Sequence, residues 1–130
     1  MKYEDYVAAA QEGGQLNEAG KKKEALLIFE RLAASDLSDL DRATMAQNAG
    51  LLLEGLERTD DALRMYDRAD ALQRPLCRST AAEWKAALLH RLGSHDACLR
   101  LYRELASAPW ATEEEKFRFR HNIAVLSGEE

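Results

Sequence analysis

The stretch from Arg58 to Pro75, RTDDALRMYDRADALQRP, decides the fold, because its pattern occurs three times in the chain. It begins with a hydroxyl residue and two acids, continues as an apolar stripe, and ends at a proline. A similar order is found upstream in KKKEALLIFERLAASDL and downstream in GSHDACLRLYRELASAP. The aromatic residues of the three copies, Phe29, Tyr66 and Tyr102, lie 37 and 36 residues apart. A period of this length is typical of proteins built from stacked helical repeats.

The composition of the 130 residues fits one soluble globular domain, with 46% apolar and 32% charged residues. The longest apolar runs fall well short of the roughly 18 residues that span a bilayer, so we expect no membrane segment. A net charge of -5 disfavours nucleic acid and anionic membranes as partners. Two cysteines, Cys77 and Cys98, and a start that lacks a basic, apolar leader predict a cytoplasmic protein.

Helix-terminus signals occur at every break in the chain, and no stretch has the alternating pattern of a strand. Ser38, Thr80 and Thr112 each stand three residues before an acid, which predicts a capped helix start at each of them. Thr59 and Ser94 are predicted to cap two further helices, since acids follow both. The sequence therefore predicts an all-α protein.

Glycine and proline divide this all-α chain into hairpins. Gly20 and Gly93 stand where a tight turn needs a positive φ, and Pro75 and Pro109 prevent the preceding helices from continuing. We expect helices at about 3–17, 21–34, 40–56, 59–73, 79–92, 94–107 and 112–126. These form one domain over 1–130, with repeats at about 3–37, 40–75 and 79–109 and a capping helix at about 112–126. Stacked hairpins bury the apolar faces that no single hairpin can bury, and the last helix covers the final one.

The chain resembles the tetratricopeptide repeat family, whose units pair two helices through small residues and an aromatic residue. The middle unit carries the resemblance best, through Gly50, Leu53, Ala62, Tyr66 and Ala69. The first unit keeps its glycines and Phe29, whereas the third has alanine and cysteine at two of the small positions. The resemblance implies a right-handed α-α superhelix of three hairpins plus the capping helix. A generic helical bundle or another α-solenoid is the alternative architecture.

No arrangement of residues in the sequence predicts catalysis or a cofactor. His95, Asp96 and Cys98 lie within one helical turn, but catalytic groups are normally brought together from separate segments. Cys98 takes the small-residue position of a helix contact, which predicts a packed and inert thiol. Metal-ligand spacings such as CxxC and HExxH are absent from the sequence. We therefore expect a non-enzymatic protein without a metal or other cofactor.

The resemblance also implies a binding surface, because the first helices of successive tetratricopeptide units line a concave groove. Family members often use an asparagine there to hold a peptide backbone, and Asn48 is the best match to it. The lysine-rich clamp of the chaperone-binding subclass is missing, which makes capture of acidic chaperone tails improbable. Carried over residue by residue, the groove consists of Gln11, Thr44, Gln47, Asn48, Leu51, Thr80, Glu83, Trp84, Ala87 and His90.

Two functions follow as expectations. The first is a protein-interaction module, an adaptor or scaffold, that binds a protein or peptide segment in this groove. No cation of the groove is evident beside Glu83, so we expect the segment to be neutral or basic. The second is a self-associating repeat protein, a homodimer in the simplest case, that uses apolar residues of the final helix as its interface. The final-helix residues concerned are Phe117, Phe119, Ile123, Val125 and Leu126.

Overall fold

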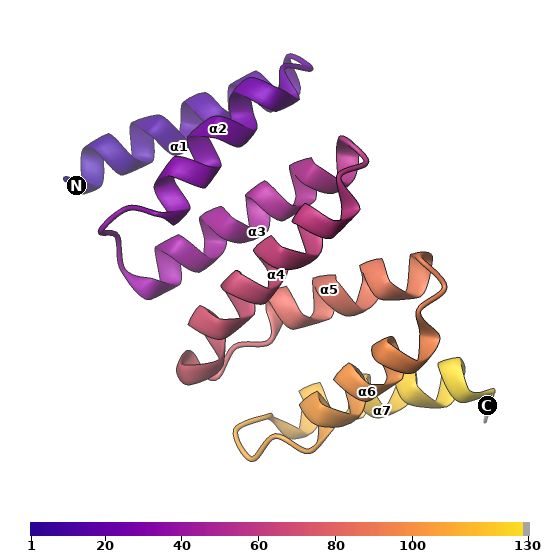
Figure 1. The fold of residues 1–130 in the computed structure, drawn as a ribbon. Coiled ribbons are helices and arrows are strands. Elements are labelled where there is room, and N and C mark those ends of the chain that lie inside the picture. The colour runs from indigo at the N-terminus through magenta and orange to yellow at the C-terminus, as the bar shows by residue number, and fades with distance from the viewer. Residues whose placement is uncertain (129–130) are drawn as a thin grey trace.

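A computed structural model describes residues 1–128, which form seven α-helices and one short 3₁₀ helix and contain no strand. The predicted all-α class is confirmed, and each predicted helix bound lies within one residue of the observed one. In chain order (Figure 1) the elements are α1 (Tyr3–Glu18), α2 (Lys22–Ala33), α3 (Asp39–Gly55), α4 (Thr59–Gln73), η1 (Arg74–Leu76), α5 (Thr80–Arg91), α6 (His95–Ala106) and α7 (Glu113–Ser127).

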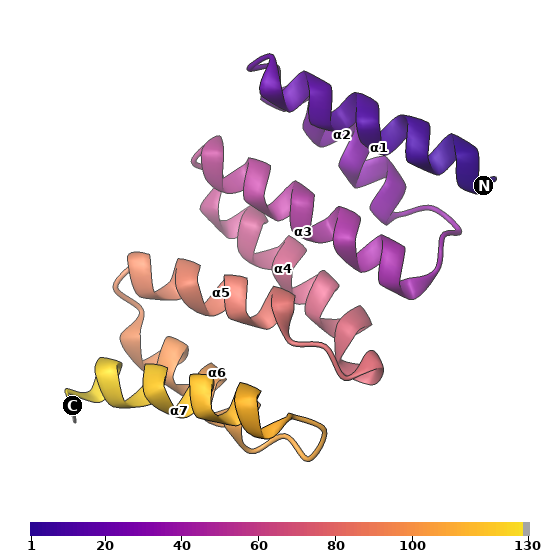
Figure 2. The same cartoon turned by 180° about the vertical axis from the view of Figure 1, so that it is seen from behind.

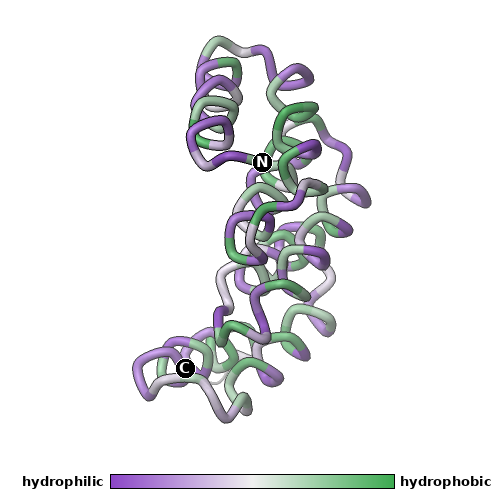
Figure 3. Tube along the Cα trace, turned by 90° about the vertical axis from the view of Figure 1, so that its left-hand side faces the viewer, coloured by the Kyte–Doolittle hydropathy of each residue, from purple (hydrophilic) through white to green (hydrophobic). Residues whose placement is uncertain are grey.

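The helices form two layers in which neighbours in sequence are neighbours in space. Each pair of successive α-helices, from α1 and α2 to α6 and α7, packs together. Helices α2, α4 and α6 lie in front in Figure 1, and α1, α3, α5 and α7 lie in front when the molecule is seen from behind (Figure 2). In the side view the stack is bowed, with α1 and the C-terminal end on the same side (Figure 3). We call the surface formed by α1, α3, α5 and α7 the odd-helix face.

The three hairpin turns share one backbone geometry. Each contains a residue with positive φ, namely Gly20 at 79°, Glu57 at 61° and Gly93 at 78°. Glycine adopts this conformation without steric cost, which confirms the predicted turn roles of Gly20 and Gly93, whereas Glu57 adopts it under strain. In each turn the next amide donates to a carbonyl of the preceding helix: Lys21 to Leu16 at 2.8 Å, Arg58 to Leu53 at 2.9 Å and Ser94 to Leu89 at 2.9 Å.

Two hairpins close through an aromatic ring that packs on a glycine. A Cβ atom on Gly50 would lie 2.6 Å from the ring of Tyr66, and one on Gly13 would lie 2.8 Å from the ring of Phe29. Only glycine therefore admits the ring at this distance. The predicted burial of Tyr66 is confirmed, since its side chain has no exposed surface.

In the third hairpin Ala86 replaces the glycine beneath the aromatic ring. The ring there, Tyr102, remains half-buried and contacts Phe119 of α7, with 6.4 Å between the ring centroids. Phe119 is fully buried beside Leu105 and Ala82. The last helix therefore completes the packing of the third hairpin, as the sequence predicts.

The helix starts were predicted correctly in position but only partly in mechanism. Ser38 accepts the amide of Asp41 at 3.2 Å. Thr112 and Glu115 form a reciprocal capping box. Thr59 caps nothing, because it is already the first residue of α4, and Ser94 makes no capping bond through its side chain. These two helices begin directly from the hairpin turns, where the backbone itself supplies the hydrogen bonds.

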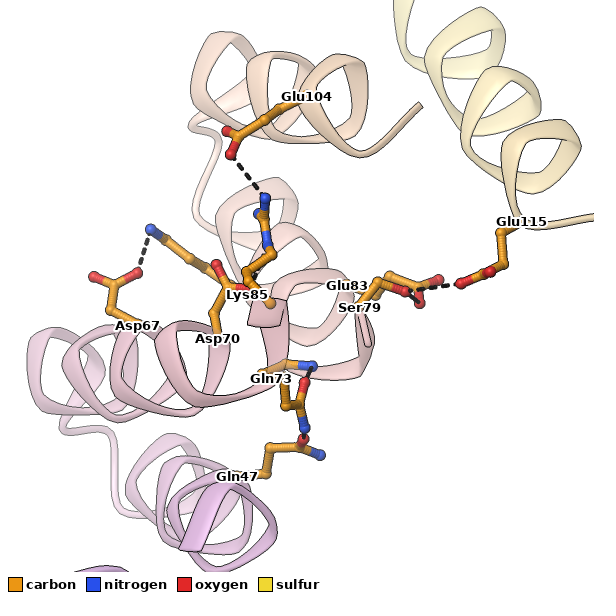
Figure 4. A network of polar contacts seen from close by, with 11 residues as sticks. Gln47, Asp67, Asp70, Gln73, Ser79, Glu83, Lys85, Glu104 and Glu115 are labelled. Atoms are coloured by element: carbon orange, nitrogen blue, oxygen red, sulfur yellow. Dashed lines mark hydrogen bonds and ion pairs between the residues drawn. The ribbon is translucent and has the colours of Figure 1, made fainter. Parts of the chain in front are cut away.

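The predicted cap at Thr80 is wrong, and the true cap comes from α4. Thr80 is the first residue of α5, and the preceding Ser79 makes no capping bond to a backbone amide. Instead the side-chain oxygen of Gln73 accepts the amide N–H of Ala81 at 2.9 Å. The amide nitrogen of Gln73 in turn donates to the side-chain oxygen of Gln47 on α3 (Figure 4). One buried carboxamide therefore positions α5 against α3 and α4.

Candidate functional site

The odd-helix face contains two hollows at equivalent places. The N-terminal hollow, of about 310 Å³, lies between α1 and α3 and is lined by Gly14, Asn17, Lys22, Phe29, Asn48, Leu51 and Leu52. The C-terminal hollow, of about 340 Å³, lies between α5 and α7 and is lined by Ala87, His90, Arg91, Cys98, Tyr102, Asn122, Val125 and Leu126.

The two hollows are built from the same positions of the repeat. Counting two repeat periods along the chain carries Gly14 to Ala87, Asn17 to His90 and Phe29 to Tyr102. A shift of 74 positions, one more than that of the first set, carries Asn48 to Asn122, Leu51 to Val125 and Leu52 to Leu126. Helix α7 therefore lies beside α5 in the register of the first helix of a further unit. The N-cap residues follow the same correspondence, since Ser38 begins α3 and Thr112 begins α7.

Between the two hollows, the corresponding gap between α3 and α5 is occupied by Trp84. This residue stands one repeat after Asn48, and its indole packs edge-on against Tyr66 with 6.2 Å between ring centroids. The Tyr66 hydroxyl donates to the Glu54 carboxylate, and Glu54 forms an ion pair with Arg91 of α5. The centre of the odd-helix face is therefore filled by the protein itself.

Both hollows combine apolar side chains with cationic groups, and the C-terminal hollow is the more apolar of the two. Phe29 lines the first and Tyr102 the second, while Leu51 and Val125 are 53% and 49% exposed beside them. Lys22 and Arg91 are the charged residues of the two linings, and neither lining contains a carboxylate. Burial raises the pKa of the Tyr102 hydroxyl and of the Cys98 thiol above their ordinary values, so both stay neutral at physiological pH.

A polar cluster joins α5 to α7 next to the C-terminal hollow. The Arg118 guanidinium makes two contacts with the Glu83 carboxylate, at 2.9 and 3.2 Å. The buried Ser79 hydroxyl donates to Glu83 at 2.9 Å and lies 3.4 Å from Glu115 (Figure 4). Backbone and side-chain hydrogen bonds from Thr112 hold the pKa of Glu115 below its ordinary value. The expectation that no cation stands beside Glu83 is therefore wrong.

The predicted groove residues are distributed between these features and the open surface. Asn48 and Leu51 line the N-terminal hollow, whereas Ala87 and His90 line the C-terminal one. Gln11, Thr44 and Thr80 are exposed on the odd helices but line neither hollow.

One groove prediction and one interface prediction need correction. Gln47 is 6% exposed and hydrogen-bonded to Gln73, so it is a buried structural residue and cannot contact a client. Phe119, expected at a self-association interface, is fully buried within the protein. Both side chains are buried within the protein. Helical periodicity alone does not show which polar or aromatic residue of a helix is buried.

Several residues of the hollows were not predicted as site residues. Lys22, Arg91 and Asn17 lie near the hairpin turns, where the sequence shows only helix ends. For Phe29 and Tyr102 the sequence predicts only the aromatic position of the repeat, at which the two helices of a unit pair. The repeat register itself was the available signal, because it aligns Asn48 with Asn122 and both with Trp84.

In comparisons with known proteins, no protein-family model matches the chain, and no curated protein matches it. Within residues 1–128, no group of three or more histidine, cysteine or acidic side chains is placed to hold a metal ion. Over the same residues, no helix has both the length and the apolar character needed to cross a bilayer.

The predicted burial of Cys98 is confirmed, and its thiol donates to the carbonyl of Ala86 at 3.2 Å.

Proposed function

We propose that this protein is a non-catalytic interaction module that binds a segment of a partner protein across the odd-helix face. In this proposal the helices form a tetratricopeptide-like, right-handed superhelix, and α7 acts as its capping helix. The observation that carries the proposal is the pair of equivalent hollows, each with an aromatic residue inside and an asparagine in its lining. A surface needed only for packing would not repeat an unfilled hollow with an aromatic residue and aliphatic side chains at matching positions.

The chemistry of the two asparagines supports recognition of a polypeptide backbone. A carboxamide both donates and accepts hydrogen bonds, as a peptide group requires. Neither Asn48 nor Asn122 has a side-chain hydrogen-bond partner within residues 1–128, and both are only half-buried. The nearby Gln47 and Gln73, by contrast, are paired with each other inside the protein. The asparagines are therefore free to bind a partner.

The charge of the partner segment is better supported as neutral or acidic than as basic. A basic segment would need a free Glu83 carboxylate, but Glu83 forms an ion pair with Arg118. Neither hollow lining contains a carboxylate; Lys22 of the first forms no ion pair within residues 1–128, whereas Arg91 of the second is paired with Glu54. We place the module in the cytoplasm, where the exposed thiol of Cys77 and the buried thiol of Cys98 would remain reduced.

Site-specific photo-crosslinking tests the proposed surface. A photoreactive amino acid is placed at Leu51 on α3 and, as a matched control, at Leu27 on α2, since these leucines are 53% and 70% exposed. Both variants are expressed in the native host, and crosslinked proteins are identified by mass spectrometry. We expect a specific partner from Leu51 and none from Leu27. A partner captured only from Leu27 would assign binding to the opposite layer and contradict the proposal.

Self-association through α7 is the second candidate function. Phe117 favours it, because this side chain is 74% exposed on the helix that ends the stack. Sedimentation of the wild type and of Phe117→Ser over a range of concentrations tests it. A wild type that stays monomeric at every concentration would exclude this candidate.

A further inference from the structure

We propose that the two hollows bind two large apolar side chains, aromatic by preference, of one extended acidic segment that crosses Trp84. This inference rests on the proposed function and specifies the chemistry of its partner. It depends on three observations: the internal occupant of the central gap, the apolar linings of the hollows and the sign of their charges.

Trp84 shows what kind of side chain fits between two odd helices. At the position that corresponds to Asn48 of α3 and Asn122 of α7, α5 carries the Trp84 indole, which packs on Tyr66, the aromatic residue of the preceding hairpin. Helices α3 and α7 carry a shorter carboxamide there, and a hollow remains above Phe29 and Tyr102. A ligand aromatic ring in either hollow would repeat the contact that Trp84 makes with Tyr66.

The linings favour a large apolar anchor over a polar one. Leu51 and Leu52 in the first hollow have Val125 and Leu126 as their counterparts in the second. An aromatic side chain that enters a hollow exchanges water for these aliphatic groups and for a ring face or edge. The hollow volumes, about 310 and 340 Å³, accommodate a single such side chain each. The hydrophobic effect thus supplies the affinity, and each asparagine can bond the adjoining peptide group.

Charge complementarity gives the sign of the segment. Lys22 forms no ion pair within residues 1–128, and it lies in the lining of the N-terminal hollow. Arg91 and His90 stand at the C-terminal hollow, where Arg91 is paired with Glu54. A carboxylate next to the first anchor would gain an attractive contact with Lys22, whereas a lysine there would be repelled.

The repeat also predicts the spacing of the anchors. Helices that lie side by side are about 10 Å apart, so hollows separated by two such steps are roughly 20 Å apart. An extended chain covers about 3.3 Å per residue, so about six residues separate one anchor from the other. A helical segment would need about twice as many residues, which distinguishes the two conformations.

A peptide array tests the anchors, their spacing and their charge with the full-length protein. Every peptide carries two tryptophans separated by two to ten residues in a Glu/Ser background, and parallel sets replace Glu by Lys or one tryptophan by Ser. Fluorescence anisotropy then measures the affinities of the selected peptides. We expect the tightest binding at a spacing near six, with at least about tenfold weaker binding for the single-tryptophan peptides and the Lys set. Equal binding by single- and double-tryptophan peptides would overturn the inference, as would a preference for the Lys set or no binding by any peptide.

Filling the hollows from within provides the matched test on the protein side. Asn48→Trp places in α3 an indole at the position that Trp84 holds in α5, and Asn122→Trp does the same in α7 at the second hollow. Each should reduce the affinity of the double-tryptophan peptide to that of the single-tryptophan peptide. The control Ala71→Trp adds an indole at an exposed position of α4 and should leave binding unchanged. Lys22→Glu provides a second variant whose folding does not depend on fitting an indole into a hollow, because Lys22 is exposed. It should weaken binding of the acidic peptide severalfold.

The two experiments distinguish failure of the aromatic-anchor inference from failure of the proposed function. A partner crosslinked from Leu51 together with a silent array would leave the odd-helix face as the binding surface and disprove the aromatic-anchor segment. Array binding that Asn48→Trp and Asn122→Trp leave intact would show that the peptides bind elsewhere, which also disproves the inference.

Discussion

The side chains of Gln47 and Gln73 are hydrogen-bonded to each other in the interior, and Gln73 also accepts the amide N–H of Ala81. Both glutamines are almost fully buried, at 6% and 3% exposure. Burial of a carboxamide is costly unless its polar atoms are bonded, so the pair constrains how α3, α4 and α5 meet. It also supplies the helix cap that the residues before α5 do not provide.

Replacement of Gln73 should therefore affect stability more than replacement of Gln47. Gln73→Ala leaves the Ala81 amide and the Gln47 carbonyl without partners, and we expect it to lower the free energy of unfolding by about 1–3 kcal/mol. Gln47→Ala keeps the bond to Ala81 and should cost less. Urea unfolding measures both, with the exposed Gln15→Ala as control. An equal loss in the two variants would show that the cap on α5 contributes nothing.

The glycines of α1 and α3 offer a second matched comparison. Gly50→Ala brings a methyl group within 2.6 Å of the Tyr66 ring, and we expect a loss of about 1–3 kcal/mol. Gly14→Ala, in the interior of α1 with nothing within 4 Å of the added Cβ, should instead stabilise by about 0.5–1 kcal/mol through helix propensity. Thermal and denaturant unfolding decide the sign. Stabilisation by Gly50→Ala would mean that Tyr66 does not pack on this glycine.

Most of the fold could be predicted from the sequence because local signals and the repeat agree. Apolar periodicity, the glycines of two turns and the hydroxyls before α3 and α7 place the helix bounds within one residue. The turn at Glu57 contains no glycine at its positive-φ position, yet its place could be predicted because the repeat register requires a turn there. The cap on α5 could not be predicted, because Gln73 reaches Ala81 only after the 3₁₀ turn between them has formed.

Two phenylalanines of α7 test the role of the last helix. Phe119 is fully buried against the third hairpin, whereas Phe117, two residues earlier, is 74% exposed. Phe119→Ala should cost about 3–5 kcal/mol, the range for truncation of a buried aromatic ring. Phe117→Ala should change stability by less than about 0.5 kcal/mol. Calorimetry compares them, and similar small effects would show that α7 does not cover the core.

The candidate site was less predictable than the fold, and the reason lies in which polar side chains are enclosed. Gln47 and Asn48 are adjacent in sequence, yet the first is buried against Gln73 and the second lines a hollow. Pairing of Glu83 with Arg118 depends on how α7 docks, which no spacing within one helix determines. The repeat register identifies Asn48, Trp84 and Asn122 as equivalent, but only packing shows that the indole fills its gap.

The hydroxyl of Tyr66 gives a prediction for alkaline pH. Burial raises the pKa of Tyr66 to about 12, whereas in the unfolded chain the group titrates near 10. Below pH 10 the hydroxyl is protonated in both states, so its contribution to stability is complete. Between pH 10 and 12 the unfolded chain releases this proton and the folded protein keeps it, so stability falls as pH rises. At about 1.4 kcal/mol per pKa unit, the loss is on the order of 2 kcal/mol.

Comparison of the wild type with Tyr66→Phe isolates this effect. The phenylalanine variant cannot ionise, so its unfolding free energy should fall less steeply between pH 10 and 12 than that of the wild type. It also loses the hydrogen bond to Glu54, which should lower the free energy of unfolding by about 1 kcal/mol already at neutral pH. Absorbance titration near 295 nm should show late tyrosine ionisations, of which one is absent from Tyr66→Phe, whereas the control Tyr3→Phe, whose ring is 69% exposed, retains them all. If Tyr66→Phe keeps the late ionisation and the full alkaline loss of stability, the Tyr66 hydroxyl is not enclosed between α3 and α4.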